Sequence, residues 1–345
     1  MRQGQNPAKM GLPAYQPKKL GLALLSYIPS QNGYFTQSLE ILKYQIASVH
    51  NSTQDFDLLI FDNGSSPQIQ DELRALQAKG LIGFLVLSRF NLGKTGALNW
   101  ILAALPNELI GFADGDVLFR PGWLEATEHI FSAFPNGGLV TAQPCLFDIL
   151  RGTGKAHVSL RDDPRYRCFD GRLAPEAVEE YARGTGLDAK KIVELKNNPV
   201  SLVEDRLSGL QAVIGASHMQ FVLRREMARR LLPLPASFAL SRDEDAYLNR
   251  SVDEMGLLHL STLSPYVYHM GNQLDEYTLA EIHRQDLDRI IQQSLSEQNE
   301  NVSVKIKSVK RRGLQILESL SRWAFFRRTI QRFYNFLFEF YSQKK

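Results

Sequence analysis

Continuous apolar runs alternate with amphipathic stretches along the first 120 residues of the chain. Apolar runs bounded by turn residues predict buried strands, and apolar residues at spacings of three and four predict helices. The predicted strands are 20–28, 56–61, 83–87 and 109–113, and the predicted helices are 34–49, 69–77 and 95–104. Such alternation is typical of a mostly parallel sheet covered by helices, so we expect an α/β fold that binds ligands beyond the carboxyl ends of its strands.

Residues 148–210 interrupt this alternation. They are rich in arginine and aspartate, and short helices are predicted at 175–183 and 188–197. A polar insertion beside a sheet edge is typical of a lid or a substrate loop. The alternative is a surface loop without a function.

The composition is that of an ordinary globular protein. The chain has 345 residues, of which 44% are hydrophobic and 22% charged, with a formal net charge of +3. This apolar content excludes general disorder, and two cysteines cannot form a disulfide framework. No run approaches the roughly 18 apolar residues that a membrane span needs. Residues 1–17 show no apolar periodicity, and we expect a flexible leader there.

Two carboxylates follow the fourth predicted strand, in the sequence Asp114-Gly115-Asp116. Because a divalent cation relieves the repulsion between two such carboxylates, and oxygen ligands favour Mg²⁺ or Mn²⁺, this segment is a candidate metal site. A turn rich in Asp and Gly, without any ligand, is the alternative interpretation.

Three further motifs accompany this one in a fixed order. They are Ser26-Tyr27 after the first strand, Asp62-Asn63-Gly64-Ser65-Ser66 after the second, and residues 91–99 at the start of the third helix. Together the four resemble glycosyltransferase family 2, whose members have the GT-A fold with a Rossmann-like sheet flanked by helices. No single motif is specific, and the ordered set carries the resemblance.

The resemblance implies roles for the matched residues. Asp62 is expected to hold the nucleotide base or ribose, and the Asp-x-Asp motif to bind metal and diphosphate. The residues expected to bind the nucleotide sugar are Tyr27, Asp62, Asn91, Lys94, Asn99 and Asp114. Lys94 is expected to neutralise phosphate, although a lysine that merely decorates a helix start is the alternative.

The second half of the chain continues the resemblance, which covers roughly residues 20–275. Residues 215–226 resemble the family's acceptor-side strand, and residues 241–248 resemble its acidic E-D-x-x-L segment. The acidic run leaves the register open by one residue: the apolar spacing favours Asp245 as the catalytic base, with Glu244 as the alternative. A solvated helix N-terminus is the interpretation without function.

His269 ends a predicted strand at the position where several relatives complete the metal shell. The resemblance therefore implies Asp116, His269 and Asp114 as ligands of Mn²⁺ or Mg²⁺. A hydrogen-bonded structural histidine is the alternative for His269. The sequence gives no such support to His218 or His259.

The implied function is metal-dependent transfer of a sugar from a nucleotide-diphosphate sugar to a glycan or lipid-linked acceptor hydroxyl, with inversion, in glycan or glycolipid synthesis. Residues 18–275 are then the catalytic domain, with the 148–210 insertion as an acceptor lid. A nucleotidyltransferase is disfavoured because no glycine-rich phosphate loop follows the first strand. A catalytically inactive, membrane-associated sugar-binding or scaffold protein is disfavoured by the retained acids Asp114, Asp116 and Asp245.

The extension 276–345 is predicted to be helical and basic. Residues 301–345 carry a net charge of +9, which leaves −6 for the rest of the chain. Within 309–341, apolar and aromatic residues at spacings of three and four predict one apolar helix face with arginines interleaved. Such a helix suits an anionic membrane, so we expect a cytoplasmic protein, peripheral on the inner face of the plasma membrane. Packing on the domain or another chain is the alternative, and no nucleic-acid partner is expected.

Overall fold

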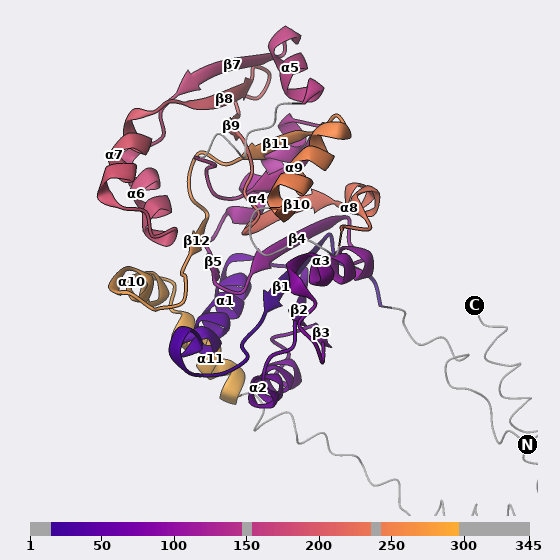
Figure 1. Ribbon diagram of the computed structural model, residues 1–345, viewed down its shortest axis with the longest axis vertical. Helices are drawn as coiled ribbons and strands as arrows, with labels where there is room; N and C mark the ends of the chain where they lie inside the picture. The colour runs from indigo at the N-terminus through magenta and orange to yellow at the C-terminus, as the bar shows by residue number, and fades with distance from the viewer. Residues whose placement is uncertain (1–14, 147–153, 236–242, 297–345) are drawn as a thin grey trace, which may run out of the picture. The chain divides into compact units, whose positions relative to one another are not determined.

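A ten-stranded sheet organises the part of the chain that the computed structural model describes, residues 15–146, 154–235 and 243–296 (Figure 1). The strand order is β3-β2-β1-β4-β10-β6-β11-β9-β8-β7. The first four strands in the sequence run parallel and are β1 (Leu20–Ser26), β2 (Phe56–Asp62), β3 (Phe84–Leu87) and β4 (Leu109–Asp114). All four predicted strands are confirmed, and so is the α/β class.

The second half of the chain completes the sheet. Its strands are β6 (Gly137–Thr141), β7 (Tyr166–Gly171), β8 (Val200–Asp205), β9 (Gln211–Ile214), β10 (Gln220–Arg224) and β11 (Leu258–Ser261). β10 lies antiparallel between β4 and β6, and β11 pairs parallel with β6. Since two antiparallel steps restore the direction, β6 and β11 point the same way as β4.

Helices cover both faces of the sheet, because successive residues of a buried strand point to opposite sides. On one face, even-numbered residues of β1 such as Leu22 pack with α1 (Ser38–Ser52), α2 (Pro67–Ala78) and α4 (Trp123–Ala133). On the other, Ala23 and Phe61 pack with α3 (Gly93–Ala104), α8 (Arg225–Leu231) and α9 (Asp243–Glu254). The three predicted helices correspond to α1, α2 and α3.

The insertion is a continuation of the sheet. The predicted helices 175–183 and 188–197 are confirmed as α6 (Pro175–Gly184) and α7 (Ala189–Asn197). They are joined by α5 (Lys155–Asp162) and by the antiparallel pair β7 and β8, which the sequence did not predict. β8 pairs with β9, and this pairing makes the insertion an edge of the main sheet. Its role as an acceptor lid stays a prediction.

Residues beyond both ends of the expected catalytic domain, 18–275, pack on it. Tyr15 falls inside the expected flexible leader 1–17, yet its hydroxyl donates to Asp57 at 2.5 Å and its ring stacks edge-on against Phe84. At the other end, α10 (Glu276–Arg284) and α11 (Leu287–Ser296) pack on α1 through Ile282 and Leu287. The compact unit ends at Leu295, and the expected domain limits stay predictions.

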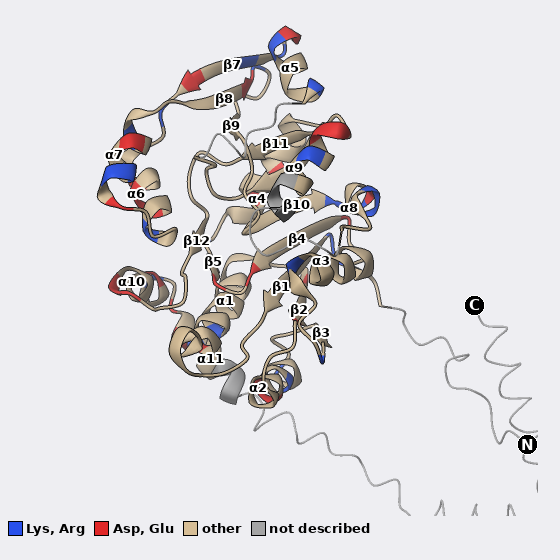
Figure 2. Cartoon of the chain, in the orientation of Figure 1, with Lys and Arg blue, Asp and Glu red and all other residues tan. Residues whose placement is uncertain are grey.

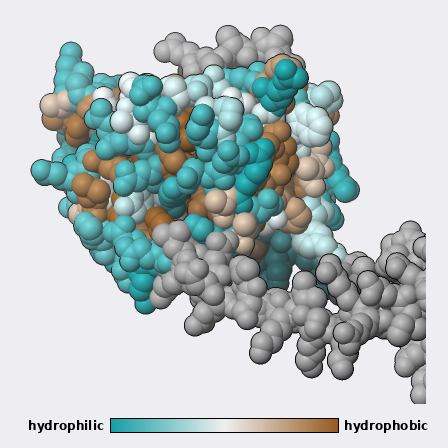
Figure 3. Space-filling view, turned by 90° about the horizontal axis from the view of Figure 1, so that it is seen from below, coloured by the Kyte–Doolittle hydropathy of each residue, from teal (hydrophilic) through white to brown (hydrophobic). Residues whose placement is uncertain are grey.

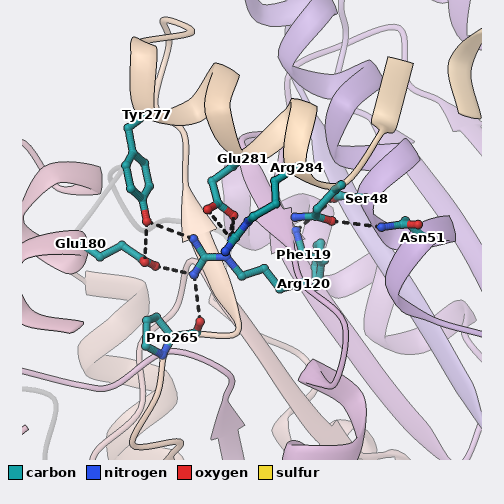
Figure 4. Close-up of polar contacts among 10 residues, drawn as sticks. Ser48, Asn51, Phe119, Arg120, Glu180, Pro265, Tyr277, Glu281 and Arg284 are labelled. Atoms are coloured by element: carbon teal, nitrogen blue, oxygen red, sulfur yellow. Dashed lines mark hydrogen bonds and ion pairs between the residues drawn. The ribbon is translucent and has the colours of Figure 1, made fainter. Parts of the chain in front are cut away.

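A short ribbon connects these layers. β5 (Val117–Phe119) pairs antiparallel with β12 (Val267–His269), apart from the main sheet. Directly after β5, the guanidinium of Arg120 donates to Glu180 of α6 at 2.7 Å, to Glu281 of α10 at 3.0 Å and to the carbonyl of Pro265 at 2.9 Å (Figure 4). Burial alone would lower the pKa of Arg120, but its two carboxylate partners raise it. This largely buried cluster links α6 of the insertion and α10 to the β5–β12 ribbon.

One face of the described surface has an ordinary distribution of hydrophobic residues. The face in Figure 3 is mostly hydrophilic, with hydrophobic residues between the hydrophilic ones, as on ordinary protein surfaces. Within the described residues, every helix is too short or too polar to cross a bilayer. The amphipathic helix expected at 309–341 lies outside the described residues.

Candidate active site

The carboxyl ends of three parallel strands bring the sequence-predicted residues together. In the sheet register Ser26 of β1 is level with Asp62 of β2, and its neighbour Leu25 is level with Asp114 of β4. A cavity of about 230 Å³ opens there. Its lining includes Ser26, Tyr27, Tyr34, Asp114, Asp116 and His269. Acidic segments at the ends of β4 and β5 are red in Figure 2.

Asp116 and His269 face each other across the β5–β12 ribbon. Asp116 directly precedes Val117, and Val117 pairs with His269. The imidazole Nε2 lies 3.1 Å from Oδ2 of Asp116, and Nδ1 lies 2.6 Å from the backbone carbonyl of Gly184 at the end of α6. Burial alone would lower the pKa of His269, but the hydrogen bond and charge of Asp116 raise it to about 9. Gly184 thus orients the ring, with Nε2 toward the carboxylate.

Asp114 has a different environment. Lys94 at the start of α3 places its Nζ 2.8 Å from Oδ1 of Asp114, and Gln45 of α1 donates to the Asp114 backbone carbonyl at 2.6 Å. Gly115 allows the sharp turn between the two acids, because a Cβ there would lie 2.8 Å from the carbonyl oxygen of Leu25. Lys94 therefore neutralises Asp114 in this structure, and its contact with phosphate stays a prediction.

The donor set fits a divalent cation. Oδ1 of Asp116 is buried and has no hydrogen-bond partner among the described residues. A carboxylate left unsatisfied in a buried position destabilises the fold unless a ligand completes it. Asp116 and Asp114 offer oxygens, and His269 offers a nitrogen once the ion displaces the proton that Nε2 shares with Asp116. This combination suits Mn²⁺. The two carboxylates and His269 are the residues that would hold such an ion.

Asp62 lies beneath the same edge of the sheet and is fully buried. Its Oδ2 accepts hydrogen bonds from the Gln70 side chain at 2.9 Å and from the Ser65 backbone at 3.2 Å, whereas Oδ1 has no partner among the described residues. Gln70 and Ser65 thus fix the carboxylate and leave one oxygen for a ligand. This geometry is compatible with the predicted contact to a base or ribose.

Of the remaining predicted residues, the two asparagines bond to the backbone or to neighbouring side chains, and the tyrosine lines the cavity. Asn91 accepts from the Asn63 side chain at 3.1 Å and from the Gly93 backbone at 2.8 Å, and so holds the turn that opens α3. Asn99 makes two hydrogen bonds to the Leu234 backbone, at 2.9 and 2.7 Å, and thereby fixes the segment that precedes α9. The contacts of both amides in this structure are therefore structural. Tyr27 lines the cavity and is 40% exposed.

The acidic run opens α9 as predicted. The helix begins at Asp243, which places Glu244 and Asp245 in its first turn. The side chains of these residues lie outside the described part of the structure. The choice between Asp245 and Glu244 as the base stays a prediction.

Comparison with known families decides the relationship. Residues 28–165 match the sequence model of the family described as Glycosyl transferase family 2. This segment belongs to glycosyltransferase family 2. The match contains Asp62, Asn91 and the Asp-x-Asp motif, and so the resemblance inferred from these motifs is confirmed for the family 2 segment.

Three solved structures are similar to the chain. The mannosyltransferase PcManGT from Pyrobaculum calidifontis, in complex with GDP-Man and Mn²⁺, is 14% identical with a TM-score of 0.41, covering 72% of this chain and 55% of that one. GalNAc-T7 with UDP, GalNAc and Mn²⁺ is 12% identical with a TM-score of 0.45, covering 73% and 43%. TarS from S. aureus is 12% identical with a TM-score of 0.42, covering 84% and 76%. The chain thus spans about half the length of the first two. A comparison with curated proteins found no match.

Sequence reasoning missed three residues that support the predicted site residues. Gln45 supports Asp114, Gln70 supports Asp62, and the Gly184 carbonyl orients His269. Gln45 was detectable in principle as a polar residue on the apolar face of a predicted helix. Gly184 had no such signal, because its backbone carbonyl acts across 85 positions.

Proposed function

We propose that the chain is a metal-dependent glycosyltransferase. It transfers a sugar from a nucleotide-diphosphate sugar to an acceptor hydroxyl in glycan or glycolipid synthesis, with inversion at the anomeric carbon. The observation that carries this proposal is the pairing of Asp116 with His269 at the strand ends, with one buried carboxylate oxygen left for a ligand, in a chain with a family 2 segment.

The chain's own residues divide the work of donor binding. Asp62 accepts a hydrogen bond from the nucleotide through its unpartnered oxygen, and Tyr27 packs against the donor in the cavity. Asp116, His269 and Asp114 hold the cation. When bound, Mn²⁺ or Mg²⁺ supplies positive charge for the departing diphosphate. Lys94 adds a second positive charge beside Asp114.

Asp245 acts as general base at the acceptor side. It accepts the proton of the acceptor hydroxyl as that oxygen attacks the anomeric carbon from the face opposite the diphosphate. Asn99 supports this arrangement indirectly, because its two hydrogen bonds to Leu234 tie α3 to the segment that leads into α9.

Donor binding tests the proposal directly. The full chain is screened by thermal shift against UDP- and GDP-sugars with and without Mn²⁺, together with Asp116→Asn and the exposed control Asp71→Asn. One donor class should stabilise the wild type and the control only with Mn²⁺, by about 2.7 kcal/mol at one hundred times its dissociation constant. If no sugar nucleotide binds, or if Asp116→Asn binds as well as the wild type, the function is wrong.

A turnover measurement tests the base. Asp245→Asn should retain donor affinity and lower turnover by a factor on the order of 10²–10⁴, the usual contribution of a positioned base. Glu244→Gln is its matched control and should have a small effect. The reverse order would move the base to Glu244, and the anomeric configuration of the product, read by NMR, tests inversion.

Membrane association through 309–341 is part of the same proposal. The +9 charge of residues 301–345 supports it. The full chain should sediment with vesicles that contain anionic lipid, less so as salt rises, and a chain cut after Ser308 should not. Equal sedimentation of both chains would exclude this role.

A further inference from the structure

A second cluster of metal-binding side chains lies away from the strand ends that carry Asp114. His157 comes from the first turn of α5, Asp253 from the last turn of α9, and His259 from the second position of β11. Because β11 runs in the same direction as β4, its start faces the opposite edge of the sheet. The cluster is therefore separate from the candidate active site.

The spacing of the three side chains is that of ligands around one ion. Oδ1 of Asp253 lies 3.8 Å from Nε2 of His157 and 3.6 Å from Nε2 of His259, and one ligand atom from each residue lies within 4.8 Å of the others. These separations are too long for hydrogen bonds. Ligands about 2.0–2.2 Å from a tetrahedral zinc ion lie roughly 3.3 Å apart, so small side-chain movements would close the site.

Burial makes an unfilled cluster costly. The side chain of His259 is fully buried, and apart from a poorly aligned contact with the Asn249 backbone its ring nitrogens have no hydrogen-bond partner among the described residues. A buried polar group without a partner destabilises the fold. The Nε2 of His157 accepts a hydrogen bond from the His259 backbone at 3.1 Å, and an ion bound there would replace this one bond.

Both imidazoles are prepared to act as neutral ligands. Burial lowers the pKa of both His157 and His259. At neutral pH each ring therefore keeps a lone pair for a metal. The backbone also makes room for the third ligand: a Cβ at residue 154 would lie 2.8 Å from Cβ of Asp253, so Gly154 lets the start of α5 approach this carboxylate.

We propose that His157, Asp253 and His259 bind one Zn²⁺ ion that ties α5 and α9 to β11. Two imidazoles and a carboxylate suit zinc, whereas Mg²⁺ and Ca²⁺ prefer sites made of oxygen ligands. A water or a further group of the chain completes the four-coordinate shell. The role of this ion is structural, and it is independent of the Mn²⁺ or Mg²⁺ assigned to Asp116 and His269.

Metal analysis of the full chain tests this site. Protein stripped with a chelator is dialysed against Zn²⁺, passed over a desalting column, and its zinc is counted by mass spectrometry and followed by thermal shift. The variants are His259→Gln and His157→Gln, with Asp116→Asn as the control for the active site and His129→Gln as a control for an exposed histidine.

Wild type, Asp116→Asn and His129→Gln should retain one equivalent of zinc and gain thermal stability from it. His157→Gln and His259→Gln should bind zinc at least 10-fold more weakly and lose that gain. If His259→Gln does not fold, His157→Gln and Asp253→Asn decide. The proposal is overturned if the wild type retains no zinc, if both cluster variants retain it, or if Asp116→Asn alone removes it.

Discussion

The two ends of strand β5 carry charged clusters of opposite character. At its start, Asp116 meets His269 and keeps one buried carboxylate oxygen without a partner among the described residues. At its end, Arg120 makes four hydrogen bonds, to Glu180, Glu281, Tyr277 and the carbonyl of Pro265 (Figure 4). The same partner strand, β12, flanks both clusters.

The difference in hydrogen bonding between the two ends distinguishes a candidate binding site from a structural contact between elements. Four of the five N–H groups of Arg120 donate inside the protein, and two carboxylates face its charge, so little is left for a ligand. The Asp116 end retains acceptor capacity that the described residues leave unused. Buried polar groups that lack partners are uncommon in folded proteins, and a ligand is an ordinary way to complete them. Substitutions at the two ends of β5, and at a second ion pair, should therefore have different effects on stability and on binding.

The largest effect is expected from Arg120→Met. Removing one member of a buried ion cluster costs about 3–5 kcal/mol where it leaves a charge unpaired. Glu180 would lose its cation, whereas Glu281 would keep its ion pair with Arg284. Glu180 and Glu281 would remain buried and charged, so the urea midpoint of the full chain should fall steeply. Adding Glu180→Gln and Glu281→Gln to the same variant should restore part of the loss. No recovery in the triple variant would mean that Arg120 acts through packing and not through charge.

Asp116→Asn should show the opposite profile. The substitution keeps the shape of the side chain and removes the charge that holds the cation, so activity with Mn²⁺ should fall by a factor on the order of 10²–10³. The urea midpoint should change little, because the wild-type carboxylate is incompletely satisfied. A loss of stability comparable to that of Arg120→Met would remove the distinction between the two ends.

Gly184→Ala should weaken the cation site without touching a ligand. A Cβ at this position would lie 2.8 Å from the backbone oxygen of His269, so the end of α6 must move and its carbonyl loses its hold on the ring. Groups that hydrogen-bond to metal ligands contribute about 10–100-fold to metal affinity, and we expect Gly184→Ala to lose about 10-fold. Isothermal titration with Mn²⁺ measures the dissociation constant. Glu179→Gln on the same helix is the control and should bind as the wild type does.

The smallest effect concerns the pH dependence of stability at the ion pair between Arg165 and Asp205. Arg165 pairs with Asp205 at 2.8 Å, and this hydrogen bond, supported by Ser208, lowers the pKa of Asp205 to about 2. Because the folded pKa lies below that of the unfolded chain, near 3.9, the pair stabilises fully above pH 4 and loses its contribution as pH falls toward 2. Asp205→Asn should cost on the order of 1 kcal/mol at pH 7 and progressively less below pH 4. A difference independent of pH would contradict the assignment.

Local patterns were sufficient for the elements that carry the donor side of the site. The apolar runs of β1, β2 and β4 end in the polar residues Ser26, Asp62 and Asp114, of which Ser26 and Asp114 line the cavity. Asp62 and Asp116 could be found in this way because strand ends follow from sequence. The pairing of Asp116 with His269 came from the resemblance to a family, since no local pattern joins residues so far apart.

Contacts between distant segments could not be predicted. Arg120 contacts Glu180 and Glu281, which lie 60 and 161 positions away in the sequence. The sequence around each glutamate is that of an ordinary helix with a polar face. β7 was missed because it is a half-exposed edge strand whose polar residues hide the alternation. His259 was set aside as a ligand because its neighbours His157 and Asp253 reach it only through the fold.

The β5–β12 ribbon also has a consequence for the time scale on which the site opens. Its flanking amides are all bonded: Arg120 to the carbonyl of Tyr266 at 3.0 Å, Met270 to that of Asp116 at 2.8 Å, and Phe119 to the Ser48 hydroxyl at 3.0 Å. Exchange of the Arg120 and Met270 amide protons with solvent requires β5 and β12 to separate, whereas exchange of the Phe119 proton requires the ribbon to leave α1. We therefore expect all three protons to exchange slowly. A site that is already ordered before the donor arrives loses little conformational entropy on binding.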